Sequence, residues 1–125
     1  VIQTVDSVEL AETIAKAAQS AGKRQDVLLQ VNIGREEQKS GAAPESVPDL
    51  ARRIAAIPSL RVAGLMAIPP AGDAEEMRPY FRELRGMRDD LGLTELSMGM
   101  TDDFEIAIEE GATIIRVGRA IFGNR

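Results

Sequence analysis

The 125-residue sequence contains neither cysteine nor histidine, and each absence excludes a kind of chemistry. Without cysteine there is no disulfide and no thiolate metal site. Without histidine the chain lacks the commonest general base and the commonest metal ligand, so Ser-His and Cys-His catalysis are ruled out. We therefore predict no catalytic residue and no metal site in this sequence.

Aromatic residues are scarce as well, and the chain has no excess of positive charge. Aromatic residues make up 3% of the chain, and the formal net charge is −5 with both signs well mixed. Nucleic-acid binding uses a basic face for phosphates and aromatic platforms for bases, so nucleic acid is excluded as a partner. No apolar run approaches the roughly 20 residues of a membrane span, and no signal segment opens the sequence. We expect a cytoplasmic protein that binds neither nucleic acid nor membrane.

What the sequence does contain is a repeated alternation of short apolar runs with segments of helical periodicity. Asp6 stands three residues before Glu9, a capping-box spacing that predicts the start of the first helix. Pro79 falls in the first turn or so of a long helix that runs to Leu91, where a missing N–H costs little. The predicted strands are Val1–Val5, Val27–Ile33, Leu60–Met66, Glu95–Met98 and Thr113–Val117.

This alternation predicts a single α/β domain over residues 1–125, with a parallel sheet and right-handed crossovers. The pattern alone does not choose between an open doubly wound sheet and part of a (β/α)₈ barrel. Five strands are too few to close an eight-stranded barrel. A partial barrel exposes the edges of its first and last strands, so we expect self-association through them.

Ligands of parallel α/β folds bind at the carboxyl ends of the strands. The turn from Ser97 to Asp103 lies at such an end and offers the hydroxyl groups of Ser97 and Thr101. Gly99 lets the backbone turn and lets a ligand approach closely. A helix start follows, which suits an anion. The alternative is that Thr101 or Asp102 only caps that helix.

The next strand end carries Arg116 and Gly118. Arg116 stands between apolar neighbours, so we expect its side chain to enter the sheet interior and to require a partner there. That partner is either a ligand or an acid on a neighbouring strand. Met66 begins an apolar, proline-rich loop that suits a wall for a planar ring, although core packing explains it equally well. The loop from Gly34 to Gly41, which includes Lys39, is interpreted as a solvated loop.

Four segments resemble one known family: TVDS (4–7), VNIGREEQKSG (31–41), GLMAIPP (64–70) and LSMGMTDDFEIAIEEGATIIRVGRAIFG (96–123). They closely resemble the pyridoxal 5′-phosphate (PLP) homeostasis protein family. The resemblance implies a fold like the N-terminal barrel of alanine racemase, with PLP at the barrel mouth joined to a lysine. It also implies a role in binding, buffering or delivering PLP in vitamin B6 balance, without a defined reaction.

The resemblance assigns roles to individual residues. Ser97 and Thr101 match positions that bond the PLP phosphate, and backbone groups near Gly99 and Gly118 join them. Arg116 matches an arginine that lies toward the pyridine nitrogen in related barrels. Met66, the last residue of the third predicted strand, matches a position that lines the site.

One part of the family pattern has no match. The Schiff-base lysine of the family stands on the first barrel strand, and counting units makes this chain the last five of eight, with the N-terminal strands absent. We therefore expect phosphate and ring contacts without covalent capture, and Lys39 is a poor substitute for the missing lysine.

Two alternative functions stay open. One is a PLP-dependent racemase-like enzyme, although Tyr80 is the only tyrosine. The other is an engineered or excised scaffold without a ligand.

Overall fold

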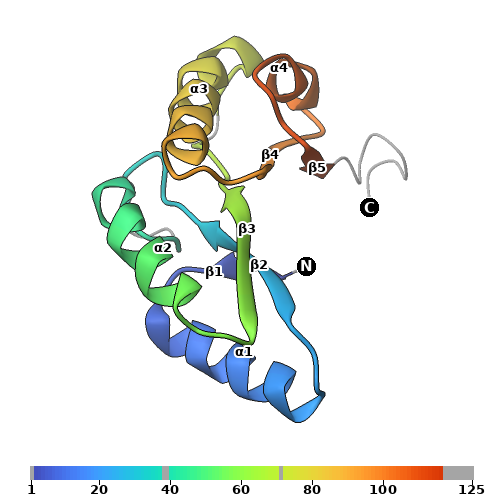
Figure 1. The fold of residues 1–125 in the computed structure, drawn as a ribbon. Helices are drawn as coiled ribbons and strands as arrows, with labels where there is room; N and C mark the ends of the chain where they lie inside the picture. The colour runs from blue at the N-terminus through green and yellow to red at the C-terminus, as the bar shows by residue number, and fades with distance from the viewer. Residues whose placement is uncertain (1, 38–39, 71, 117–125) are drawn as a thin grey trace.

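The computed structural model describes residues 2–37, 40–70 and 72–116. Its strands alternate with helices along the chain, and all strand pairs are parallel in the sequential order β1-β2-β3-β4-β5. The α/β class with a parallel sheet is thereby confirmed. Figure 1 shows the helices on the outer side of a curled sheet. The elements are β1 (Ile2–Val5), α1 (Val8–Ser20), β2 (Gln25–Gln30), the 3₁₀ helix η1 (Pro44–Ser46), α2 (Val47–Ala55), β3 (Leu60–Met66), α3 (Ala74–Asp90), β4 (Glu95–Met100), α4 (Phe104–Glu109) and β5 (Ile114–Arg116).

The sheet is curled tightly enough for strands that are not neighbours to touch. The hydroxyl of Ser97 on β4 donates a hydrogen bond to Oε1 of Gln3 on β1, with 2.6 Å between the oxygens. Two strands stand between β1 and β4, so a flat sheet would separate them by about 14 Å. The contact therefore selects the partial barrel over the open sheet that the sequence also allowed.

The two faces of the sheet bury different sets of side chains. Val27 and Leu29 of β2 point outward into the larger cluster beneath the helices, where Phe81 and Leu84 of α3 and Ile54 of α2 also pack. Leu28, between Val27 and Leu29, points the other way and packs with Ala63 and Met66 of β3 and with Ile114 of β5. The inner, concave face is thus lined by a small apolar cluster of its own.

The first helix begins one residue later than its capping-box spacing predicted. Ser7 is the N-cap of α1, because its Oγ accepts the backbone N–H of Leu10 at 3.2 Å. Asp6 instead accepts the backbone N–H of Gly41 at 3.1 Å and ties the loop after β2 to the start of α1. A long-range hydrogen bond therefore replaced the local cap predicted for Asp6.

Other boundaries also differ from their predictions. Strand β2 runs from Gln25 to Gln30, so it begins two residues and ends three residues earlier than the predicted Val27–Ile33. Pro79 is the sixth residue of α3, beyond the first turn, because the helix already begins at Ala74. Strand β4 continues through Gly99 and Met100, two residues further than predicted, because Met100 still pairs with Arg116 of β5. Residues that were expected to form a turn are therefore part of the sheet.

Candidate functional site

Three of the residues predicted to form the site meet on the inner face: Met66 and Arg116 at the ends of β3 and of the described part of β5, and Ser97 within β4, beside the end of β3. Met66 ends β3 and lies in register with Ser97 of β4, and Arg116 ends the described part of β5. The backbone N–H of Ala67 donates to the carbonyl of Ser97 at 3.1 Å, which joins the end of β3 to the middle of β4. Met66 is also nearly fully buried, in the small inner cluster.

Ser97 is fully buried, and its hydroxyl is already engaged by Gln3. The 2.6 Å separation is short even for an O–H···O bond, so the hydroxyl proton is directed at the amide oxygen. Ser97 can act on a ligand only if the hydroxyl turns away from Gln3 or uses its own oxygen as an acceptor. Sequence reasoning missed Gln3, because no local signal in the sequence links residue 3 to residue 97.

Arg116 is half-buried and only partly satisfied. Its Nη2 donates to the carbonyl of Ala67 at 3.4 Å, a long hydrogen bond that crosses β4 to the end of β3. Its buried Nε has no hydrogen-bond partner among the residues that the structure describes. Burial lowers the pKa of Arg116, and the charge of Asp103 acts in the opposite direction. Of the two partners predicted for Arg116, no acid pairs with it in the described part of the chain.

Gly99 adopts φ +103°, a left-handed backbone that favours glycine. A Cβ atom at this position would lie 2.6 Å from the Cβ of Ala107 and 3.3 Å from Cγ2 of Ile115. The glycine therefore allows α4 and β5 to pack closely against β4. This role explains the glycine without a ligand, and the predicted close approach of a ligand at Gly99 stays a prediction.

Thr101 lies in the turn after β4 and is half-exposed. It lines a pocket of about 240 Å³ together with Ala74 at the start of α3 and the first residues of α4. Arg116 and Met66 are not among the described residues of that pocket. Thr101 thus stands at the rim of the carboxyl edge, apart from the inner-face residues.

Asp103, at the end of this turn, is the N-cap residue of α4, a position predicted for Thr101 or Asp102. Its Oδ1 accepts the backbone N–H of Met100 at 2.7 Å, a bond directed back toward β4. The carboxylate therefore fixes the turn against the strand end and leaves the helix start uncapped by a side chain.

A buried carboxylate directly after α4, on its C-cap residue Glu110, fixes that helix to α3. Glu110 is 6% exposed, and its two oxygens accept from Nη1 of Arg78 at 2.5 Å and from Nε of Arg82 at 3.1 Å. Hydrogen bonds from Arg78 and then Arg82 hold the pKa of Glu110 below its usual range. This ion cluster sets the position of α4 and, through it, the turn that carries Thr101.

Two residues of the predicted site and its surroundings, Gly118 and Lys39, lie outside the described residues. Within residues 2–37, 40–70 and 72–116, no three acidic side chains gather where they could hold a metal ion. None of the helices in these ranges is both long and apolar enough to cross a bilayer.

Comparison with known proteins identifies relatives of the whole chain. The pyridoxal phosphate homeostasis protein of Aquifex aeolicus is 47% identical over 131 residues, which cover 99% of this chain and 58% of that protein. A crystal structure of an unknown protein from Bifidobacterium adolescentis superposes with a TM-score of 0.88 at 42% identity, over 97% of this chain and 52% of the other. The chain thus spans between half and two thirds of the length of these relatives.

A further similar structure contains bound PLP. PipY of Synechococcus elongatus, solved with PLP bound, superposes with a TM-score of 0.81 at 33% identity, over 93% of this chain and 57% of PipY. The curled five-stranded half-barrel therefore matches part of a barrel that holds PLP in that protein. The family model for the N-terminal domain of alanine racemase matches residues 1–125. The chain accordingly belongs to the alanine racemase N-terminal domain family.

Proposed function

We propose that this chain supplies the phosphate and ring contacts of a PLP-binding protein that acts in vitamin B6 homeostasis. The observation that carries the proposal is the unpartnered Nε of Arg116, buried at the carboxyl edge of the sheet beside the ends of β3 and β4. A buried guanidinium N–H without an acceptor costs free energy that a ligand atom would recover. PLP offers such acceptors in its pyridine nitrogen, its phenolate and its phosphate.

Each residue has a distinct task in the proposed site. Arg116 donates to the ring, Met66 supplies an apolar wall, and Thr101 donates its hydroxyl to the phosphate at the rim. Ser97 joins the phosphate contacts when its hydroxyl turns from Gln3. Gly118 is proposed to offer a backbone N–H to the phosphate, on the strength of the sequence resemblance alone.

Among the residues that the structure describes, none at the proposed site is a lysine that could hold the aldehyde of PLP. The sequence has three lysines, at positions 16, 23 and 39. Lys16 lies on α1 and Lys23 stands two residues before the amino end of β2, so both are remote from the carboxyl edge. PLP supplies an aldehyde and an electron-withdrawing ring when bound, and this chain orients the phosphate and ring without a covalent bond.

The same residues argue against a racemase-like reaction by this chain. Racemisation on PLP needs a further group that moves a proton. Tyr80 stands on α3 and packs against the larger cluster on the outer side of the sheet. We therefore assign the chain a carrier or regulatory role rather than a reaction.

The proposal is tested with pyridoxine 5′-phosphate, which keeps the ring and the phosphate and has no aldehyde. Calorimetric titration is expected to show binding that pyridoxine, without the phosphate, does not match. Arg116→Gln is expected to weaken binding about tenfold, because a hydrogen bond to a charged group is lost. The control is Arg85→Gln on α3, which makes the same change of charge. Equal affinity for both ligands, or equal losses in both variants, refutes the proposal.

We also propose that two copies of the chain associate through their open strand edges, in the cytoplasm. In the described part of the chain, β1 pairs only with β2 and β5 only with β4, so each leaves a row of backbone donors and acceptors free. Such edges pair readily with another chain. Light scattering at increasing concentration is expected to show a dimer, and a monomer at millimolar concentration contradicts this proposal.

A further inference from the structure

A second pocket lies at the opposite end of the sheet from the candidate site. It has a volume of about 580 Å³ and opens between the last two turns of α1 and the loop that joins α2 to β3. Arg24 immediately precedes β2 and Ser59 immediately precedes β3, so the pocket adjoins the amino ends of these strands. The candidate site lies at the carboxyl ends, and the two places therefore share no residue.

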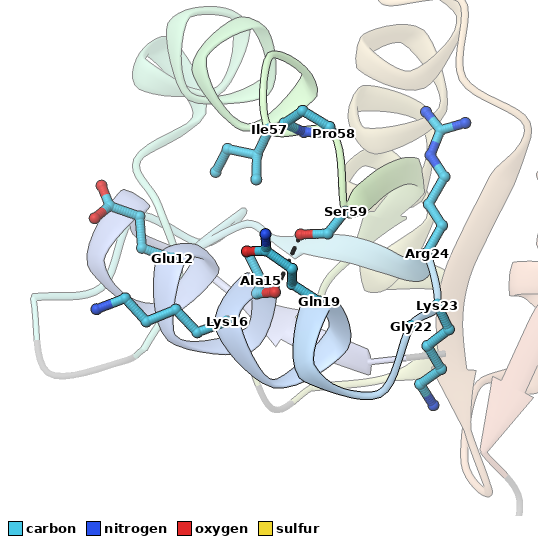
Figure 2. Close-up of a pocket in the computed structure, with 10 residues that line it drawn as sticks. All are labelled: Glu12, Ala15, Lys16, Gln19, Gly22, Lys23, Arg24, Ile57, Pro58 and Ser59. Atoms are coloured by element: carbon cyan, nitrogen blue, oxygen red, sulfur yellow. Dashed lines mark hydrogen bonds between the residues drawn. The ribbon is translucent and has the colours of Figure 1, made fainter.

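The floor of this pocket is apolar, and its polar groups stand around it. Ala15 of α1 is buried, and Figure 2 shows Ile57 and Pro58 facing α1 across the pocket. The hydroxyl of Ser59 is engaged, because it donates to the carbonyl of Ala15 at 3.1 Å. The amide of Gln19 forms no side-chain hydrogen bond with any described residue and is free to donate or accept.

Three cations surround the pocket without an acidic partner. Lys16, Lys23 and Arg24 line it, and none of them forms an ion pair with a described residue, although Nε of Arg24 donates to the carbonyl of Leu60 at 3.3 Å. Glu12 is the only acid among the described residues of the lining. This local excess of positive charge stands out in a chain whose net charge is −5.

In a neighbouring pocket, two of the three cations among the described lining residues form ion pairs with acidic side chains. It has a volume of about 510 Å³ and shares Arg24 with the first pocket. Its other two cations are paired, Arg52 with Asp49 at 2.5 Å and Arg61 with Asp26 at 2.8 Å. The charge left without a partner is therefore concentrated around the first pocket.

The end of α1 does not account for these cations. Gly22 adopts φ +67°, and its backbone N–H donates to the carbonyl of Gln19 at 3.0 Å. The N–H of Lys23 donates to the carbonyl of Ala18 at 3.0 Å. This is a Schellman motif, in which backbone groups satisfy the last carbonyls of the helix. The cationic side chains are consequently not used as helix caps.

We propose that this pocket binds a small molecule that carries an anionic group on a flat apolar body. The volume lies in the range of small-molecule sites, which combine an apolar lining with a few polar groups. Ile57 and Pro58 contact the apolar body, and the amide of Gln19 helps to orient the ligand. Arg24 pairs with the carboxylate or phosphate, and the charge of Lys16, which stands at the other end of the pocket in Figure 2, adds to the preference for anions.

The test follows backbone amide shifts of the 125-residue chain by NMR during titration with benzoate, phenyl phosphate and the neutral analogue benzamide. Both anions are expected to shift the amides of Ala15, Gln19 and Ser59 at millimolar concentration, and benzamide is expected to bind at least about fivefold more weakly, the effect of losing an accessible ion pair. Comparison of benzoate with phenyl phosphate shows which anionic group is preferred.

Substitutions of single cations show whether anion binding depends on the charges that line the pocket. Arg24→Gln is expected to weaken anion binding about two- to fivefold, the size of a single solvent-accessible ion pair, and Lys16→Gln is expected to weaken it by less, because Lys16 acts from the other end of the pocket. Arg85→Gln removes a cation of α3 that forms no ion pair with a described residue and does not line this pocket, and it is expected to leave binding unchanged. Equal binding of benzamide and benzoate, shifts elsewhere than around the pocket, or an equal loss in the Arg85 variant overturns the proposal.

Discussion

Replacing Gly99 by alanine tests whether this glycine is required by packing beneath the candidate site. The positive φ of +103° imposes backbone strain on any other residue, a cost of about 1–3 kcal/mol. The new methyl group would also lie 2.6 Å from the Cβ of Ala107, and such overpacking costs a further ~1–3 kcal/mol. We expect a loss of about 3 kcal/mol in the free energy of unfolding, since partial relaxation of α4 relieves some of the clash.

Two other glycines separate these contributions. Gly22 has φ +67°, and a methyl group added there would meet no atom within 4 Å, so Gly22→Ala measures strain alone and is expected to cost about 1 kcal/mol. Gly86 lies inside α3 with open space around it, so Gly86→Ala is expected to stabilise the protein by about 1 kcal/mol. Urea unfolding followed by circular dichroism gives all three values from the transition midpoints and slopes. A loss at Gly99 no larger than the loss at Gly22 refutes the packing argument.

The remaining predictions concern individual side chains. Glu110→Gln is expected to lower stability at neutral pH. Because the Arg78 ion pair depresses the Glu110 pKa, the wild-type chain loses that stabilisation as pH falls through the folded-state value, and urea midpoints from about pH 7 to pH 3 should fall less in the variant. Gln3→Leu removes the acceptor of the buried Ser97 hydroxyl and should cost about 1–3 kcal/mol, whereas adding Ser97→Ala should recover part of that loss in a double-mutant cycle. Borohydride reduction with excess PLP should leave no specific adduct, and a stoichiometric adduct on Lys39 by mass spectrometry contradicts non-covalent binding.

Local chemistry was enough to predict most elements of this fold. The apolar run Leu60–Met66 is a strand with the predicted bounds, because a strand buried on both faces leaves a continuous apolar signal. The helix boundaries were less predictable, since caps depend on contacts from elsewhere. Ser7 caps α1 because Asp6 is engaged by Gly41, a partner 35 residues away.

Part of the candidate site was predictable from the sequence, and part depended on the folded structure. Sequence alone directed attention to Met66, Ser97 and Arg116, because strand ends in parallel folds gather at one edge. The structure places Met66 and Arg116 at the ends of the described strands, and Ser97 lies within β4, in register with Met66. The hydrogen bond between Ser97 and Gln3 was not predictable, because it depends on how far the sheet curls. The role of Gly99 in packing was likewise hidden, since it depends on where α4 and β5 lie.

The sequence by itself determined the parallel α/β architecture, the exclusion of histidine and cysteine chemistry, and the absence of a lysine from the five strands. These conclusions follow from composition and from periodicity, which act locally along the chain. Only the tertiary structure decided that the sheet curls into a half-barrel, and that Arg116 lacks a partner for its Nε among the described residues. It also decided that three cations, none with an acidic partner in the described part of the chain, line one pocket. Each of these depends on groups distant in sequence, whose burial and pairing are fixed only when the chain has folded.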